Sequence, residues 1–278
     1  MTAFTEQEAY RIIDGLKFNN PVLVAGWIDD VSGIGERTLD YIIEGTGCRL
    51  CAEILPEGFF PLAGVTVENN VARFPESDFY GCSERNLLVF KSSIPRTGWH
   101  RFLLSMLDVA GAFGVNEIYT VGAMVSAAAH TMPRVLMGIV NNGAIKGRLE
   151  PYNVMTGADF ETPPAQKPTF SSYLSWVARQ RNIDTVNLWV PVPFYLVQSG
   201  DPRACKRLIY FFNDKYGLGL DFTAIDEEIA DQNRRIADLY VASPEIEQWV
   251  RRLETGEGLD SEQSEKLAQG MSERLKKK

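Results

Sequence analysis

Continuous apolar runs alternate with amphipathic stretches over most of the chain. Runs of roughly four to eight apolar residues are typical of strands that are buried on both faces of a sheet. Such strands are predicted at residues 21–28, 86–91, 117–122, 134–140 and 185–190. Apolar residues three and four positions apart predict helices at residues 36–44, 99–113 and 171–181, and helices that begin near 202, 223 and 244. Strands that alternate with helices predict an α/β fold with a largely parallel central sheet covered on both faces.

The pattern changes toward the C-terminus. Beyond residue 255, charged residues dominate and apolar residues are sparse, which is typical of a loosely held helix or a flexible tail. We therefore expect an α/β core domain at residues 1–240 and a C-terminal helical extension with a flexible tail at residues 241–278.

Charge and composition narrow the classes of partner. The formal net charge of −8 over 278 residues repels nucleic acid and anionic lipid, so neither is an expected partner. No apolar stretch reaches the roughly 20 residues that cross a bilayer, and the first residues have no signal-peptide core. Four cysteines are few for this length and favour free thiols in a reducing compartment. We expect a cytoplasmic protein.

The loop after the first predicted strand is a candidate for one side of a ligand cleft. In open α/β sheets, ligands bind outside the carboxyl ends of the strands, where Asp29, Asp30 and Gly33 lie. The segment Gly33-x-Gly35-x-x-Thr38 lacks the third glycine of the dinucleotide-binding pattern, and two carboxylates repel phosphate. A tight turn into a helix is the favoured interpretation.

Three other residues complete the candidate cleft. Arg96 and Trp99 follow the second predicted strand, where charge and stacking could hold an anion or a base. A loop held in place by a half-buried tryptophan is the favoured alternative. His130 is one of only two histidines, so it is a candidate for acid–base chemistry, although an ordinary polar loop residue is the favoured interpretation.

A corner with two prolines follows the last predicted strand. We expect the strand to end at this corner, which contains Trp189, Pro191, Pro193 and Tyr195. Aromatic side chains supply rigid contact area, so these four residues are candidates for an interface with a partner. A well-packed internal corner is the alternative.

Complete catalytic sets are not recognisable. The chain has no G-x-S-x-G elbow and no G-x-x-x-x-G-K-[ST] phosphate loop, and its cysteines and histidines lack the spacing of a metal site. We therefore expect no cofactor, no metal and no catalytic residue, and a binding role is favoured over catalysis.

Several segments together resemble the proteasome assembly chaperone 2 family. The likeness covers roughly residues 20–240 and rests on the first strand with its glycine turn and on four motifs: IPRTGW at 94–99, HTMPRV at 130–135, LWVPVPFY at 188–195 and DPRA at 201–204. The resemblance implies a three-layer α/β/α fold like that of the purine nucleoside phosphorylases. It also implies a homo-oligomer, with a trimer favoured, and a protein partner.

The resemblance implies an assembly function. Eukaryotic members of the family help to assemble the proteasome core, and some archaeal relatives bind it through an ending of a hydrophobic residue, a tyrosine and any residue. This chain ends Leu275-Lys-Lys-Lys278 and lacks that ending. We expect a non-catalytic oligomeric binding protein or assembly factor. The alternative is a nucleoside phosphorylase-like or ATP-dependent ligase-like enzyme that uses the candidate cleft.

Overall fold

A nine-stranded sheet forms the centre of the molecule. The computed structural model describes residues 9–28, 30–61, 66–68, 70–159, 161, 163 and 166–275. The strands are β1 (Tyr10–Ile12), β2 (Val22–Trp27), β3 (Arg49–Ile54), β4 (Thr66–Glu68), β5 (Val71–Arg73), β6 (Ser77–Cys82), β7 (Leu87–Ser92), β8 (Glu117–Ser126), β9 (Leu136–Val140), β10 (Val154–Met155) and β11 (Asp184–Pro193). The helices are α1 (Ile34–Thr46), α2 (Trp99–Ala112), α3 (Phe170–Arg179), α4 (Pro202–Tyr216), α5 (Thr223–Ala242), α6 (Pro244–Glu254) and α7 (Ser261–Leu275).

The sheet is mixed, so the expected parallel arrangement applies only to its centre. The strand order is β1-β3-β6-β7-β2-β8-β11-β9-β10, whereas β4 and β5 form a separate hairpin. Strands β7, β2, β8 and β11 are mutually parallel. The pairs β1–β3, β3–β6, β6–β7 and β9–β11 are antiparallel. The expectation missed β6, which lies between β3 and β7 in the sheet and runs opposite to both, because no α-helix separates these three strands in the chain.

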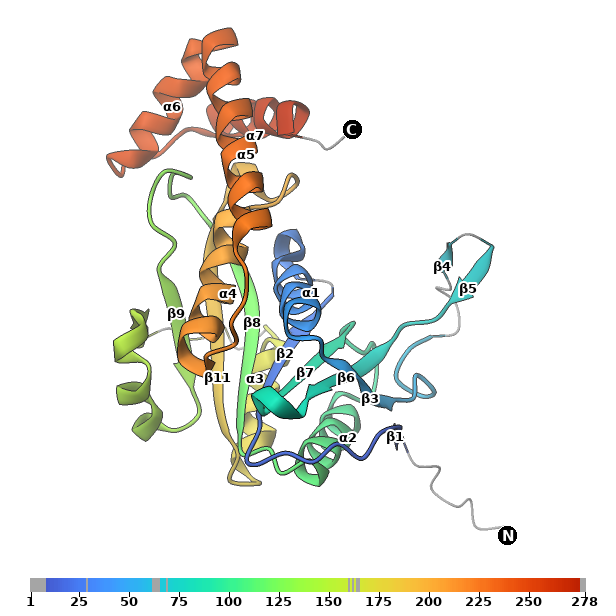
Figure 1. Cartoon of the computed structure of the whole chain (residues 1–278). Coiled ribbons are helices and arrows are strands. Elements are labelled where there is room, and N and C mark those ends of the chain that lie inside the picture. Colours follow the sequence, from blue (N-terminus) through green and yellow to red (C-terminus); the bar gives the residue numbers. More distant parts are fainter. Residues whose placement is uncertain are drawn as a thin grey trace.

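Helices cover both faces of this sheet, which gives three layers (Figure 1). Successive side chains of a strand point to opposite faces. On β2, Val22 and Val24 pack in the cluster that contains α1 and α4, whereas Leu23, Ala25 and Trp27 pack in the cluster that contains α2 and α3. All five side chains are buried, which explains the continuous apolar run in the sequence.

Strand β11 continues through its prolines, contrary to the prediction that it ends before them. It pairs with β8 in parallel from Asp184 to Pro193. Strand β9 pairs only with the part of β11 between Val186 and Trp189. Beyond Trp189, β11 therefore has a neighbour on one side only, and a proline at such an edge removes no ladder hydrogen bond.

The C-terminal helices form a head above the sheet (Figure 1). Helix α5 rises from the core, and α6 and α7 pack against it. Helix α7 also packs against the short 3-10 helix Phe194–Leu196 at the end of β11. Leu267 and Met271 are fully buried there. Residues 261–275 therefore form a packed helix, whereas the sequence predicted a loosely held helix or a flexible tail. A few well-spaced apolar residues suffice for such a short helix. The last three residues, Lys276–Lys278, which were compared with the docking ending of the archaeal relatives, lie outside the described residues.

Candidate functional site

The loops after β2, β7 and β8 carry the predicted cleft residues at the carboxyl ends of parallel strands. The structure does not gather them around one cavity. Asp30 contacts β8, Trp99 contacts α3, and His130 contacts Tyr195, so they lie in three separate environments. Asp29 lies outside the described residues.

Asp30 joins the first loop to the neighbouring strand. The β2–β8 pairing ends at Gly26 and Val121. The Asp30 carboxylate accepts hydrogen bonds from the backbone N–H of Ala123 at 3.1 Å and from that of Gly35 at 3.2 Å. Burial raises the pKa of this carboxyl to about 6. The carboxylate thus extends the sheet pairing by one more hydrogen bond.

Gly33 has a conformational role. Its φ of +63° places it in the left-handed region at the N-terminus of α1, where glycine is favoured. This geometry matches the tight-turn interpretation of the loop.

Arg96 and Trp99 border a surface hollow of about 740 Å³ next to α3. The Trp99 indole N–H donates to the carbonyl of Pro95 at 2.7 Å, and its ring makes an edge contact with Phe170 at 4.9 Å. Arg96 is exposed. The geometry matches the alternative that a half-buried tryptophan holds the loop.

His130 is tied to Tyr195, a residue predicted to contact a partner. The Tyr195 hydroxyl accepts from the backbone N–H of His130 at 2.7 Å and lies 2.9 Å from its ring Nδ1. Burial, followed by the charge of Arg134, lowers the pKa of His130 to about 4. A neutral, tethered imidazole is a poor general acid near pH 7.

The proline corner faces inward more than predicted. Tyr195 is only 1% exposed and Pro193 is also buried, so neither side chain can contact a partner. Trp189 and Pro191 are partly exposed. The expectation failed for Tyr195 because α7 covers the end of β11.

Sequence reasoning missed a buried ion pair beside His130. The Arg134 Nε donates to the Asp201 carboxylate at 2.8 Å, and both side chains are almost completely buried. Asp201 also accepts from the backbone N–H groups of Arg203 and Ala204, so it caps α4, the helix that the sequence predicted to begin near residue 202. The cap was recognisable in the sequence, but its partner 67 residues away was not.

The end of β8 and the loop that follows it also expose apolar side chains. Met124, Val125, Met132 and Val135 are exposed by 36%, 52%, 40% and 39%. We call these four side chains the outer surface. Of these four, Met132 also lines a hollow of about 660 Å³. Phe194 and the α6–α7 connection line the same hollow. The sequence signal was available, because the apolar run of β8 continues past the predicted end at Gly122.

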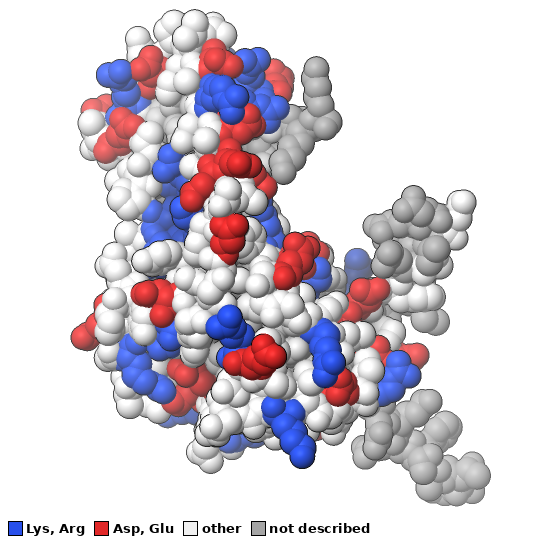
Figure 2. All heavy atoms as spheres, viewed as in Figure 1, with Lys and Arg blue, Asp and Glu red and all other residues white. Residues whose placement is uncertain are grey.

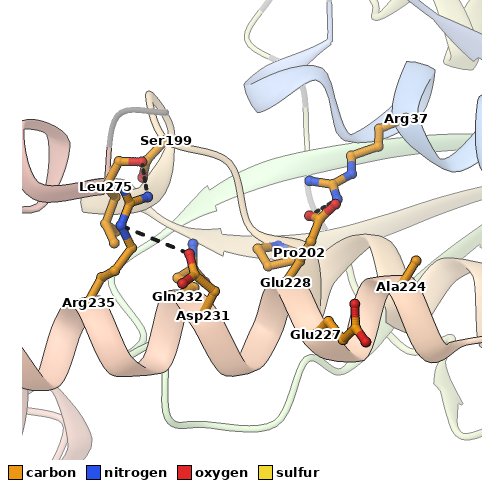
Figure 3. A pocket seen from close by; sticks show the side chains of 10 residues that line it. All are labelled: Arg37, Ser199, Pro202, Ala224, Glu227, Glu228, Asp231, Gln232, Arg235 and Leu275. Carbon is orange, nitrogen blue, oxygen red and sulfur yellow. Dashed lines mark hydrogen bonds and ion pairs between the residues drawn. The ribbon is translucent and has the colours of Figure 1, made fainter. Parts of the chain in front are cut away.

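A polar groove separates α5 from the core (Figure 3). Arg37 of α1 forms an ion pair with Glu228 of α5. Arg235 donates to the carbonyl oxygen of Leu275 at 3.2 Å and faces Asp231. These contacts fix α5 to α1 and to the end of α7.

Metal and membrane features are absent from the part of the chain that the structure describes. No group of three or more histidine, cysteine, aspartate or glutamate side chains is arranged to hold a metal ion there. None of the described helices is long and apolar enough to span a bilayer.

Comparisons with known proteins agree with this fold. Among curated proteins, none matches the sequence. A Mycobacterium tuberculosis protein of unknown function has a TM-score of 0.74 at 18% identity, over 99% of this chain and 100% of that one. A proteasome-assembly chaperone homologue from the same organism has a TM-score of 0.65 at 17% identity, over 78% and 94%. PbaB, an archaeal proteasome activator from Pyrococcus furiosus, has a TM-score of 0.66 at 17% identity, over 84% and 99%. The sequence model of the PAC2 family matches residues 23–240, and the chain therefore belongs to the PAC2 family.

Proposed function

We propose that this chain is a non-catalytic assembly factor that forms a homo-oligomer, with a trimer favoured, through its outer surface. The observation that carries the proposal is the exposure of four large apolar side chains on one short segment. Large apolar side chains exposed close together along the chain are candidates for contact with another protein. In this proposal, a second copy of the chain covers the outer surface.

Two further points support a binding role. The polar groups at the strand ends, Asp30, His130 and Asp201, already hold backbone or side-chain partners within the chain. The relatives with described roles, PbaB and the Mycobacterium tuberculosis homologue, are a proteasome activator and a proteasome-assembly chaperone homologue. We extend to this chain only the general role of these proteins, which is binding to a multi-subunit protein complex.

Light scattering coupled to gel filtration tests self-association directly. The wild-type chain is expected to elute with three times the mass of one chain, and Val125→Glu to elute as a monomer because a buried unpaired carboxylate opposes association. Val241→Glu is the matched control, since Val241 is 86% exposed on α5. A monomeric wild-type chain would contradict the proposal, as would equal dissociation by both variants.

A further inference from the structure

A second hollow lies on the other side of the loop that carries the outer surface. It has a volume of about 470 Å³ and lies between that loop, α4 and α5. Figure 2 shows basic side chains gathered along the side of α5 that faces this loop. The lining residues are Thr131, Met132, Pro133, Arg134, Arg203, Lys206, Arg207, Tyr210, Asp226 and Ile229.

Positive charge dominates this hollow in a chain whose net charge is −8. Arg203, Lys206 and Arg207 are three and four positions apart and therefore share one face of α4. Asp226 is the one acidic residue among the described lining residues, and it pairs with Lys206. The lining thus holds one carboxylate and four cationic side chains, of which Arg134 is also paired with Asp201 outside the lining.

The two α4 arginines have neutral partners only. Arg203 donates to the side-chain oxygen of Asn233 at 3.1 Å. Arg207 donates to the backbone carbonyls of Tyr152 at 2.7 Å and Asn153 at 3.2 Å. Within the described part of the chain, no carboxylate lies within ion-pair distance of either guanidinium, and Asp214 attracts Arg207 from a greater distance.

Arg134 also lines the hollow, and one of its nitrogens, Nε, pairs with Asp201. Its side chain is 4% exposed, and its Nη2 has no hydrogen-bond partner among the described residues. A buried guanidinium nitrogen without an acceptor is costly, and an anionic oxygen is a strong acceptor for it. The charges of Arg134 and Arg203 also contribute, after burial, to the lowered pKa of His130, which agrees with a positive potential at this place.

We propose that this hollow binds the phosphate group of a small ligand. Guanidinium groups match phosphate oxygens in pairs, and Lys206 adds a point charge on the same face. The volume exceeds that of a phosphate ion, and the half-exposed ring of Tyr210 offers a flat surface for the rest of a ligand. This site is independent of the proposed assembly function, because it uses none of the apolar side chains that define the outer surface except the flank of Met132.

Isothermal titration calorimetry at constant ionic strength tests the site with inorganic phosphate, adenosine monophosphate and adenosine. Both phosphate compounds are expected to bind the full-length chain, and adenosine is not. Tighter binding of the nucleotide would identify a phosphate carried on a larger ligand, and equal binding would identify free phosphate. Binding of adenosine as strong as that of the nucleotide would overturn the proposal, as would the absence of binding by both phosphate compounds.

Two double variants locate the binding. Arg203→Ala with Arg207→Ala is expected to weaken phosphate binding at least roughly tenfold, because two charge-assisted contacts are lost. Arg234→Ala with Arg251→Ala removes the same charge at exposed positions outside the hollow and is expected to bind like wild type. If circular dichroism shows that the first variant does not fold, Lys206→Gln replaces it. Unchanged affinity in the folded α4 variant would overturn the proposal.

Discussion

The segment that connects β8 to β9 has two sides of opposite character. Its inner side carries His130 and Arg134, which are buried and bonded to Tyr195 and Asp201. Its exposed apolar side chains are Met132 and Val135, and the adjoining end of β8 exposes Met124 and Val125. Most surface loops have the reverse arrangement, with polar groups in water and apolar groups inside.

Hydrogen bonds and an ion pair hold the buried polar side chains of the segment. A buried polar group needs partners, so each inner side chain fixes the backbone at one position. The apolar side chains on the outer side are therefore held in place without being needed for folding, and they remain available for contact with another molecule.

Removal of the inner carboxylate is expected to have the largest effect. Asp201→Ala leaves Arg134 buried without a counter-charge and removes the cap of α4, so the free energy of unfolding is expected to fall by about 3–5 kcal/mol. Urea denaturation followed by circular dichroism measures it. Asp108→Ala breaks the more exposed pair with Arg181 and is expected to cost at most about 1 kcal/mol. Equal losses of unfolding free energy in the two variants would contradict a larger contribution of the buried Arg134–Asp201 pair.

The pH dependence of stability tests the buried imidazole. Folded His130 has a pKa near 4, whereas the unfolded value is about 6.5, so the unfolded chain binds more protons between these values. Stability is therefore expected to fall as the pH drops from 6.5 to 4, by on the order of 2 kcal/mol from this residue. His130→Asn removes this component, which is measured as the difference between unfolding free energies at pH 7 and pH 4.5.

Asp30 provides a control of opposite sign. Its folded pKa is raised to about 6 from 3.8, so the folded chain binds the proton first. Its contribution to stability is expected to rise as the pH falls through 6 toward 3.8, and Asp30→Asn removes that rise. Parallel changes of slope in the two variants would contradict the assignment of the two pKa shifts.

Loss of the tyrosine hydroxyl is expected to have an intermediate effect. Tyr195→Phe leaves the backbone N–H and the ring Nδ1 of His130 without their acceptor and donor, at a cost of about 1–3 kcal/mol. In the matched control, Tyr41→Phe, the lost hydroxyl bonds to the carbonyl of Asp221 at an exposed position, where water replaces it. The melting temperatures of both variants compare the two sites. A larger decrease for Tyr41→Phe than for Tyr195→Phe would contradict the stabilising role of the Tyr195–His130 contact.

The outer side is expected to tolerate polarity. Val125→Thr is expected to change the free energy of unfolding by at most about 0.5 kcal/mol, because its side chain is half exposed. Val121→Thr on the same strand buries a hydroxyl and is expected to cost about 1–3 kcal/mol. Urea denaturation at low protein concentration compares them. A large loss at residue 125 would mean that the outer surface belongs to the core.

Sequence periodicity predicted the elements that are buried on both faces or along one stripe. Strand β2 and helix α2 lie within one residue of their expected bounds, because their apolar patterns are long and regular. Strand β8 is longer than predicted: Gly122 resembles a terminator in the sequence, but the strand pairs with β11 as far as Ser126. The pairing partner, which the local sequence does not contain, decides where such a strand ends.

The candidate site was predictable only in its parts. His130 and Tyr195 were both singled out, but for different roles, since 65 residues separate them and only the tertiary fold brings them together. Arg134 was read as the start of a strand, because a buried charge has no signature in a single sequence unless its partner is known.

The contact between α7 and the 3-10 helix after β11 has a consequence for synthesis of the protein. Tyr195 and Leu196 leave the ribosome well before residues 261–275, which cover them in the finished fold. Until those later residues emerge, the end of β11 is an unprotected apolar surface on a nascent chain. During translation, this corner therefore stays exposed to non-native contacts until α7 docks against it.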